Sequence, residues 1–298
     1  MKRSFFSIFC LGLLIFGPLG LEALEIEFTG GLNNLTFHPD RVKTAHGESA
    51  NYRQFSGYPY GFGDFYLKND ISNDVFGVLG FSVHASRDNI LRNSIGGSLF
   101  ANTEFFRMEF GLFLGAGDRL EIPNAGITGS LEFMYPGIFF LSVNGSSTLG
   151  AQFDFTGNNS RESFEFKLGF WLPNVIPAFS ISTKNYTDHP EDSIVIYDEL
   201  VRFHFDVDIF AKNFPVVFRV NVGYEILKRS YRREDSNIMD ELRAIYAGLE
   251  VKWQITKPVR IIAGFETPVS LWAVQPMQNP ANIFSLYKFH GGFSYTFF

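Results

Sequence analysis

The residues with the greatest potential for chemistry in this sequence are His204, Asp206 and Asp208, which alternate with apolar residues. In an extended strand, side chains two residues apart point to the same face, so the imidazole and both carboxylates would share one face. A carboxylate beside a histidine can orient the ring as a general base. The same residues also fit a network of structural ion pairs. We favour that interpretation, because they lie towards the middle of their segment and no second acidic and basic pair accompanies them.

Two other histidines share an alternating face with serine. His84 has Ser82 and Ser86 two residues away on either side, and His290 has Ser294 four residues away. A serine and a histidine meet in this way often by chance, and the sequence contains no nucleophile elbow, HExxH, P-loop or EF-hand motif. We therefore expect no enzymatic activity, no cofactor and no bound metal ion.

The segment that carries His204 has one apolar face and one ionic face. Its apolar residues are Val201, Phe203, Phe205, Val207 and Ile209, and they alternate with Arg202, His204, Asp206 and Asp208. Segments 106–114, 164–170, 216–226 and 245–253 repeat the pattern. A period of two residues indicates β-strands. Runs of about 10 to 14 residues suit strands that cross a bilayer at a tilt.

The composition supports a β-structured protein and excludes several other classes. Of the 298 residues, 46% are hydrophobic, 17% are aromatic and only 19% are charged, which excludes a disordered chain. The 28 glycines and the aromatic content favour strands joined by tight turns over helical bundles. The net charge of -6 lacks the basic character of a nucleic-acid binder.

The first residues have the pattern of an export signal. Met1, Lys2 and Arg3 precede an apolar or small stretch that runs from Ser4 to Leu21. This pattern predicts a secretory signal peptide over residues 1–23, with a membrane anchor as the alternative. Cys10, the sequence's one cysteine, lies within that stretch. Residues 24–298, which we expect to form a single domain, therefore contain neither a disulfide nor a thiolate metal ligand.

Alternating strands in a bilayer need a closed sheet, because an open edge would leave backbone groups without hydrogen bonds in lipid. The pattern resembles the outer-membrane β-barrel proteins of bacteria with a double envelope. The last segment adds to the resemblance, since Tyr287, Phe289, Gly291, Phe293, Tyr295 and Phe297 alternate up to Phe298. A final strand that ends in an aromatic residue is similar to the signal that the barrel-assembly machinery reads in that family.

Turn residues divide the chain into about 14 strands, with about 12 as the alternative if 138–155 is counted differently. The predicted strands are 24–37, 57–67, 75–86, 91–101, 104–115, 125–135, 138–155, 162–172, 177–186, 199–210, 215–227, 241–254, 258–267 and 284–297. Short links, with Lys68 to Asp74 slightly longer, would then lie on the periplasmic side. The long links 38–56, 187–198, 228–240 and 268–283 would lie outside.

The inward faces carry both signs of charge, and charges at bilayer depth must be paired or hydrated. The residues predicted to line the lumen are Arg107, Glu109, Glu132, Glu165, Lys167, Arg202, His204, Asp206, Asp208, Arg219, Glu225, Glu250, Lys252, Arg260, Glu266, Lys288 and His290. About 14 strands enclose more space than such side chains fill.

The resemblance implies a porin-like channel in the bacterial outer membrane for the passive passage of small hydrophilic solutes. Two alternatives remain open. The apolar segment 268–283 suits a transporter for small hydrophobic compounds of the fatty-acid transporter type, and a barrel with a closed lumen could anchor a surface adhesin. The expected partners are outer-membrane lipid, the assembly machinery and small solutes, with no nucleic acid, and we expect a monomer.

Overall fold

The computed structural model describes residues 23–33, 36–37, 55–56, 60–74, 77–87, 93–116, 125–149, 160–191, 194–210, 214–233, 236–273 and 287–297. The expected signal peptide lies outside these residues, apart from Ala23, and so does Phe298. Within the described part, no helix has the length and apolar character needed to cross a membrane.

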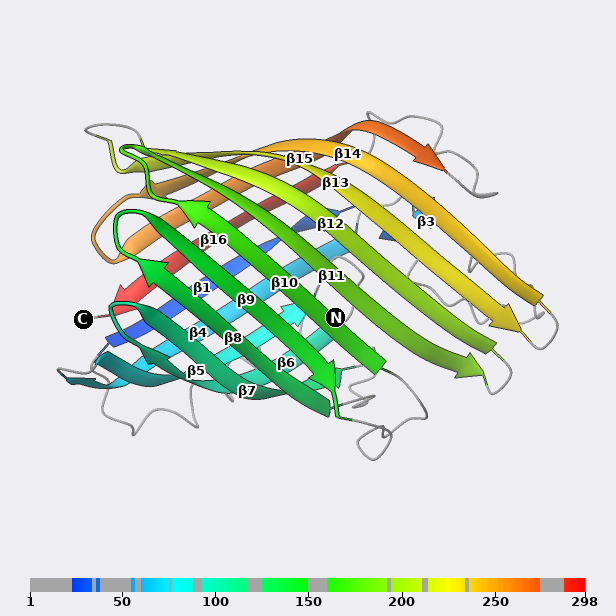
Figure 1. Cartoon of the computed structure of the whole chain (residues 1–298), viewed down its shortest axis with the longest axis horizontal. Coiled ribbons are helices and arrows are strands. Elements are labelled where there is room, and N and C mark those ends of the chain that lie inside the picture. The colour runs from blue at the N-terminus through cyan, green and yellow to red at the C-terminus, as the bar shows by residue number, and fades with distance from the viewer. Residues whose placement is uncertain are drawn as a thin grey trace.

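Fourteen antiparallel strands form a closed barrel (Figure 1). The predicted count of about 14 is therefore confirmed, and the alternative of about 12 is wrong. The strands are β1 (Ala23–Asn33), β4 (Tyr60–Asp74), β5 (Gly77–Arg87), β6 (Asn93–Asn102), β7 (Phe106–Ala116), β8 (Ala125–Tyr135), β9 (Phe139–Thr148), β10 (Ser160–Phe170), β11 (Val175–Glu191), β12 (Ile194–Phe210), β13 (Val216–Arg233), β14 (Ser236–Gln254), β15 (Val259–Ala273) and β16 (Lys288–Phe297). The short strands β2 (Thr36–Phe37) and β3 (Phe55–Ser56) pair with each other outside the barrel.

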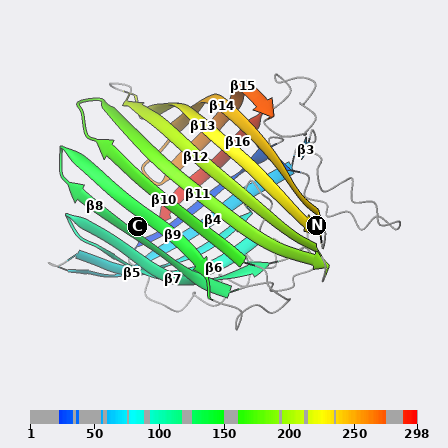
Figure 2. The same ribbon diagram turned by 45° about the vertical axis from the view of Figure 1, so that its right-hand side comes forward.

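The barrel closes between its first and last strands. β1 pairs with β16 from Leu24 opposite Phe297 to Asn33 opposite Lys288, and it pairs with β4 on its other side. The strands cross the wall obliquely, as closure of a sheet requires (Figure 2). Every barrel strand therefore has a neighbour on both sides, which satisfies the backbone without water.

The outer surface of the barrel is apolar. On that face, Leu99, Phe110 and Leu112 are 69%, 62% and 60% exposed. A soluble protein would bury such residues, so their exposure fits contact with lipid hydrocarbon. These residues come from the faces that the sequence predicted to be apolar.

Aromatic side chains gather at both ends of the apolar surface. At the end that contains Ala23 and Phe297, Tyr295 packs on Phe297 with ring centroids 4.5 Å apart. At the opposite end, Tyr224 stacks on Trp272 at 6.0 Å and on Phe203 at 6.3 Å. Such pairs of aromatic belts mark the two interfaces of a bilayer. The short turns 103–105, 136–138, 171–174 and 255–258 lie at the first end, which is therefore the periplasmic end.

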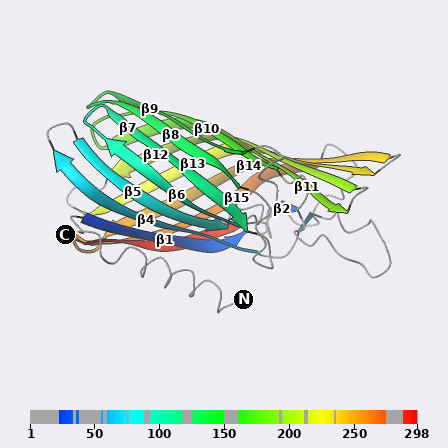
Figure 3. The ribbon, with the colours of Figure 1, turned by 90° about the horizontal axis from the view of Figure 1, so that it is seen from below.

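Several strands extend further than the sequence predicted. The segments 187–198 and 228–240 were expected to be loops. Instead, the first continues β11 into β12 as one hairpin, and the second continues β13 into β14 as another. The four strands project beyond the rest of the wall (Figure 3). The prediction failed because polar residues in these segments resemble a loop. They pair across strands instead, for example Lys228 with Glu199 at 3.3 Å.

Four other predicted segments also differ from the structure. The expected strand 138–155 ends at Thr148, and residues 150–159 lie outside the described part. Lys68 to Asp74, expected to be a link, completes β4 with a register shift between Asp70 and Ser72. The first part of the expected loop 268–283 belongs to β15, which ends at Ala273. The loop 38–56 contains β2's partner, Phe55–Ser56, and is otherwise outside the described part.

Candidate functional site: the inner wall of the barrel

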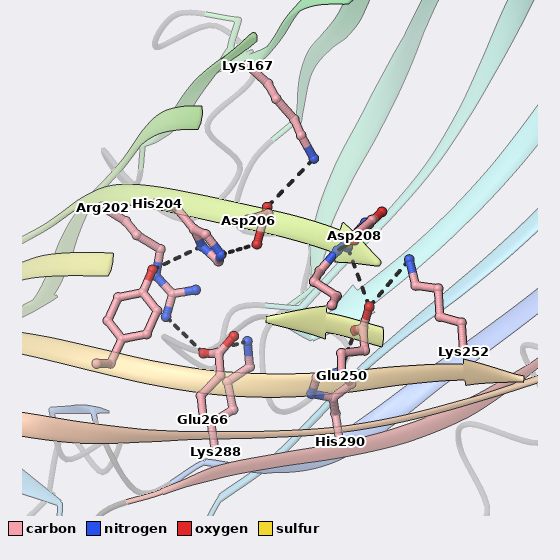
Figure 4. Close-up of polar contacts among 12 residues, drawn as sticks. Lys167, Arg202, His204, Asp206, Asp208, Glu250, Lys252, Glu266, Lys288 and His290 are labelled. Atoms are coloured by element: carbon pink, nitrogen blue, oxygen red, sulfur yellow. Dashed lines mark hydrogen bonds and ion pairs between the residues drawn. The ribbon is translucent and has the colours of Figure 1, made fainter. Parts of the chain in front are cut away.

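The structure places the seventeen predicted lumen residues on the face of the sheet opposite to the exposed apolar side chains. The alternation alone decides this, because Phe203, Phe205 and Ile209 are exposed on the outside while Arg202 and Asp206 between them are not. Most of the charged residues on β12 to β16 join in ion pairs, and two connected groups can be distinguished (Figure 4).

The first group is centred on Arg202. Its guanidinium donates to Glu225 at 2.9 Å and to Glu266 at 3.3 Å, and it lies 4.4 Å above the ring of Tyr246. Lys288 approaches Glu266 at 3.7 Å from β16. Two cations and two carboxylates thus neutralise one another over four strands. The Glu225 side chain is only 3% exposed, which makes this the driest part of the group.

His204 connects this group to β10. Its Nδ1 is 3.0 Å from the hydroxyl of Tyr246, and its Nε2 is 2.5 Å from Asp206 Oδ1. Lys167 reaches the other oxygen of Asp206 at 3.8 Å. Both ring nitrogens of His204 are therefore engaged by protein groups. This arrangement supports the structural interpretation of the His204, Asp206 and Asp208 pattern over the catalytic one.

The second group lies nearer the periplasmic end. Arg219 donates two hydrogen bonds to Asp208, at 2.6 and 2.9 Å, and a third to Glu250 at 3.4 Å. Glu250 also meets Lys252 at 3.3 Å and His290 at 2.8 Å. The fork of the arginine and the shared carboxylate hold β12, β13, β14 and β16 together.

Two glycines allow these contacts to reach across an intervening strand. The ring of Tyr246 on β14 lies over Gly223 on β13 and thereby reaches His204 on β12. His290 on β16 crosses Gly264 on β15 in the same way and reaches Glu250. A methyl group at either glycine would collide with the ring above it. The absence of a side chain at these positions is therefore a requirement of the network.

A third set of contacts lies at the closing seam. Arg260 on β15 is 3.6 Å from Glu25 and 3.4 Å from Glu27, both on β1, and it also reaches Ser294. Sequence reasoning missed Glu25 and Glu27 as partners, as it missed Tyr246. The signal was present, because Glu25 and Glu27 alternate with apolar residues at the start of the first strand.

The wall from β5 to β10 is built differently. Ser82, Ser98, Gly111, Thr128, Ser146 and Ser163 lie directly opposite one another on six successive strands. We call this row the small-residue sector. Its charges are few and more open: Arg107 is 3.5 Å from Glu132 with half of its side chain exposed, and Glu109 accepts a hydrogen bond from Ser82.

The remaining residues that were considered for catalysis or ion pairing do not come together in the structure. His84 is exposed and approaches Asp64 at 3.6 Å, with no described contact to a nucleophile. Glu165 faces inward from β10 opposite Ser182. Among the described residues, no three His, Cys, Asp or Glu side chains gather in a way that would hold a metal ion.

A closed barrel of fourteen strands with an apolar exterior, aromatic belts and a charged interior has the architecture of a bacterial outer-membrane β-barrel. No family model and no curated protein matches the sequence.

Solved structures share the architecture at very low identity. The COG4313 outer membrane channel from Pseudomonas putida F1 is 9% identical over 94% of this chain and 96% of its own, with a TM-score of 0.48. A loop L8 deletion mutant of OmpT from Vibrio cholerae is 10% identical over 93% and 99%, with a TM-score of 0.43. A refined porin structure is 7% identical over 93% and 100%, also at 0.43. The function must be argued from this chain's own residues.

Proposed function

We propose that this protein is a monomeric porin-like channel through which small hydrophilic solutes diffuse across the outer membrane. The observation that carries the proposal is the small-residue sector, in which six strands present serine, threonine or glycine to the interior. Fourteen strands enclose more space than an eight-stranded barrel, whose side chains can fill its interior. The shortest side chains leave the most room for water, so the path of the solute lies along this sector.

The paired charges on the inner face of β10 and β12 to β16, which we call the ionic wall, support the same function with weak charge selectivity. Its cations and carboxylates are paired at 2.6 to 3.8 Å, as for Arg219 with Asp208 and Lys167 with Asp206. Paired charges present dipoles to the lumen, and the field of a dipole falls off faster than that of a free charge. The channel therefore discriminates chiefly by size and only weakly by charge.

The test is the single-channel conductance of the refolded protein in a planar bilayer. Thr128→Trp places a bulky side chain in the small-residue sector, and Ile127→Trp places the same side chain on the lipid face of the same strand. We expect stable conductance steps that Thr128→Trp reduces and Ile127→Trp leaves unchanged. Loss of conductance in both variants alike, or no conductance in a protein shown to be folded by circular dichroism, would refute the proposal.

A second candidate function is the passage of small hydrophobic compounds, and one observation favours it. Leu200, Leu227 and Leu242 lie directly opposite one another on β12, β13 and β14, face inward and are buried. They lie on the extracellular side of the Arg202 group and form an apolar patch at the outer end of the lumen. If this function holds, Leu227→Ser will lower the uptake of a fatty acid into vesicles while ion conductance persists.

A further inference from the structure

One inward-facing arginine differs from the others in the described strands. Arg107, Arg202, Arg219, Arg229 and Arg260 each have a carboxylate within 4.0 Å. Arg161 on β10 has none. Its Nε and Nη1 atoms are buried and have no hydrogen-bond partner. A buried N–H donor without an acceptor is unfavourable, and more so when it is charged.

The surroundings hold this guanidinium in place. It lies 5.4 Å from the ring of Phe113 on β7 and 5.8 Å from the ring of Tyr186 on β11. Phe113 reaches it by lying across Gly126 on β8, where a methyl group would collide with the ring. The Thr148 hydroxyl accepts a hydrogen bond from the Arg161 backbone N–H at 2.7 Å and donates to its carbonyl at 3.0 Å. The side chain is thus positioned by aromatic rings and not by a counter-charge.

A second inward-facing cation, for which the described residues provide no ion pair, lies on the adjacent strand. Lys184 faces inward on β11, opposite Ser163, while Arg161 is opposite Tyr186 on the same strand. The two are diagonal neighbours, a relation that corresponds to about 7 Å between Cα atoms. The nearest carboxylate along the inward face of β10, Glu165, forms no ion pair with either of them within the described residues. The register thus puts two cations on adjacent strands of the inner face, and an anion that reaches both of them would be favoured.

We propose that Arg161 and Lys184 form a binding site for the carboxylate group of a small organic acid at the outer end of the lumen. This inference rests on the proposed function, because it names a solute class for the same channel. The N–H groups of a guanidinium donate charge-assisted hydrogen bonds to carboxylate oxygens, and the ammonium of a lysine adds a point charge. Arg161 is half-buried as a whole, so part of its side chain reaches open space. Because β10 begins at Ser160 on the extracellular side, the site lies near the outer mouth of the barrel.

The site can be tested by calorimetric titration of the folded full chain in detergent. Benzoate is the probe, and benzamide is its neutral counterpart of almost the same shape. We expect saturable binding of benzoate and none of benzamide. Arg161→Gln should weaken benzoate binding by about tenfold or more, because a charge-assisted hydrogen bond is lost. Arg161→Lys should have an intermediate effect.

Arg232→Gln is the matched control, since Arg232 is exposed and faces outward on β13, opposite Val195. It removes the same charge and should leave binding unchanged. If Arg161→Gln fails to fold, Phe113→Leu keeps the charge, removes one of the flanking rings and should weaken binding. Benzamide binding as tight as that of benzoate, unchanged binding in Arg161→Gln, or no binding to the unmodified protein would overturn the inference.

The titration separates this inference from the proposed function, because binding in detergent requires no passage through the barrel. A barrel that conducts ions but does not bind benzoate refutes the carboxylate site alone. A barrel that binds benzoate but does not conduct refutes the channel alone.

Discussion

The ion pair between Arg202 and Glu225 offers a measurement of how dry the ionic wall is. Arg202→Met removes the cation that Glu225 contacts at 2.9 Å, and the Glu225 side chain is only 3% exposed. Glu266 keeps Lys288 at 3.7 Å, so the variant leaves one carboxylate, that of Glu225, without a cation within the group. Removing one partner of a buried pair in this way destabilises a protein by about 3–5 kcal/mol.

The complementary change should be milder. Glu225→Gln leaves Arg202 with Glu266 at 3.3 Å, so no charge is stranded, and we expect a loss of about 1.5–3 kcal/mol for a hydrogen bond to a charged group. The double variant carries neither the cation nor the stranded carboxylate. It should be more stable than Arg202→Met alone, which implies a coupling energy of about 2 kcal/mol or more.

The free energy of unfolding of the two single variants and the double variant would be measured by guanidinium titration of the barrel in lipid vesicles. The same double-mutant cycle, applied to Arg107 and Glu132, serves as the control. Their side chains are 50% and 25% exposed and 3.5 Å apart, which is the regime of surface pairs worth about 1 kcal/mol or less. Equal coupling energies for the two pairs would refute the reasoning, because the ionic wall would then be as wet as the small-residue sector.

Three further predictions address packing, selectivity and assembly. Gly223→Ala should displace the ring of Tyr246 and lower the free energy of unfolding by about 1–3 kcal/mol. Gly129→Ala is the control and should be neutral, because the added methyl is 3.6 Å from the nearest atom. Arg107→Gln removes an exposed lumen cation, so the reversal potential in a salt gradient should shift towards cation preference; an unchanged potential would argue against a solute path along this wall. Phe297→Ser should reduce barrel assembly in cells, measured by heat-modifiable mobility, but not refolding in detergent, and equal losses in both would contradict an assembly signal.

The existence and faces of the strands could be predicted from the sequence, but several of their ends could not. Period-two alternation identifies a strand wherever one face meets lipid and the other meets the interior. In the outer halves of β11 to β14 both faces carry polar residues, so the contrast between the faces disappears. The outer halves of β11 to β14 therefore resembled loops, although cross-strand pairs such as Arg229 with Asp198 continue there, in this case with two hydrogen bonds at 2.6 and 2.7 Å.

For the candidate site, too, one part could be predicted from the sequence and another could not. Alternation places Arg202, His204 and Glu266 on the inner face, but their partners depend on register and on the glycines between them. The contact between His204 and Tyr246 crosses a strand at Gly223, and no spacing within either segment contains that information. It becomes visible only when the pairing of β12, β13 and β14 is known.

The two walls of the lumen imply that charge count and charge selectivity are separate properties of this channel. Arg219 is held by two carboxylates, so its neutralisation would strand Asp208 and weaken the barrel more than it would change the field in the lumen. Arg107, Arg161 and Lys184 are less compensated and lie in or beside the small-residue sector, where we place the solute. Their removal should change selectivity more than stability. For the channel that we propose, selectivity would therefore depend on a few open charges, whereas the many paired ones would determine the shape of the space available to a solute.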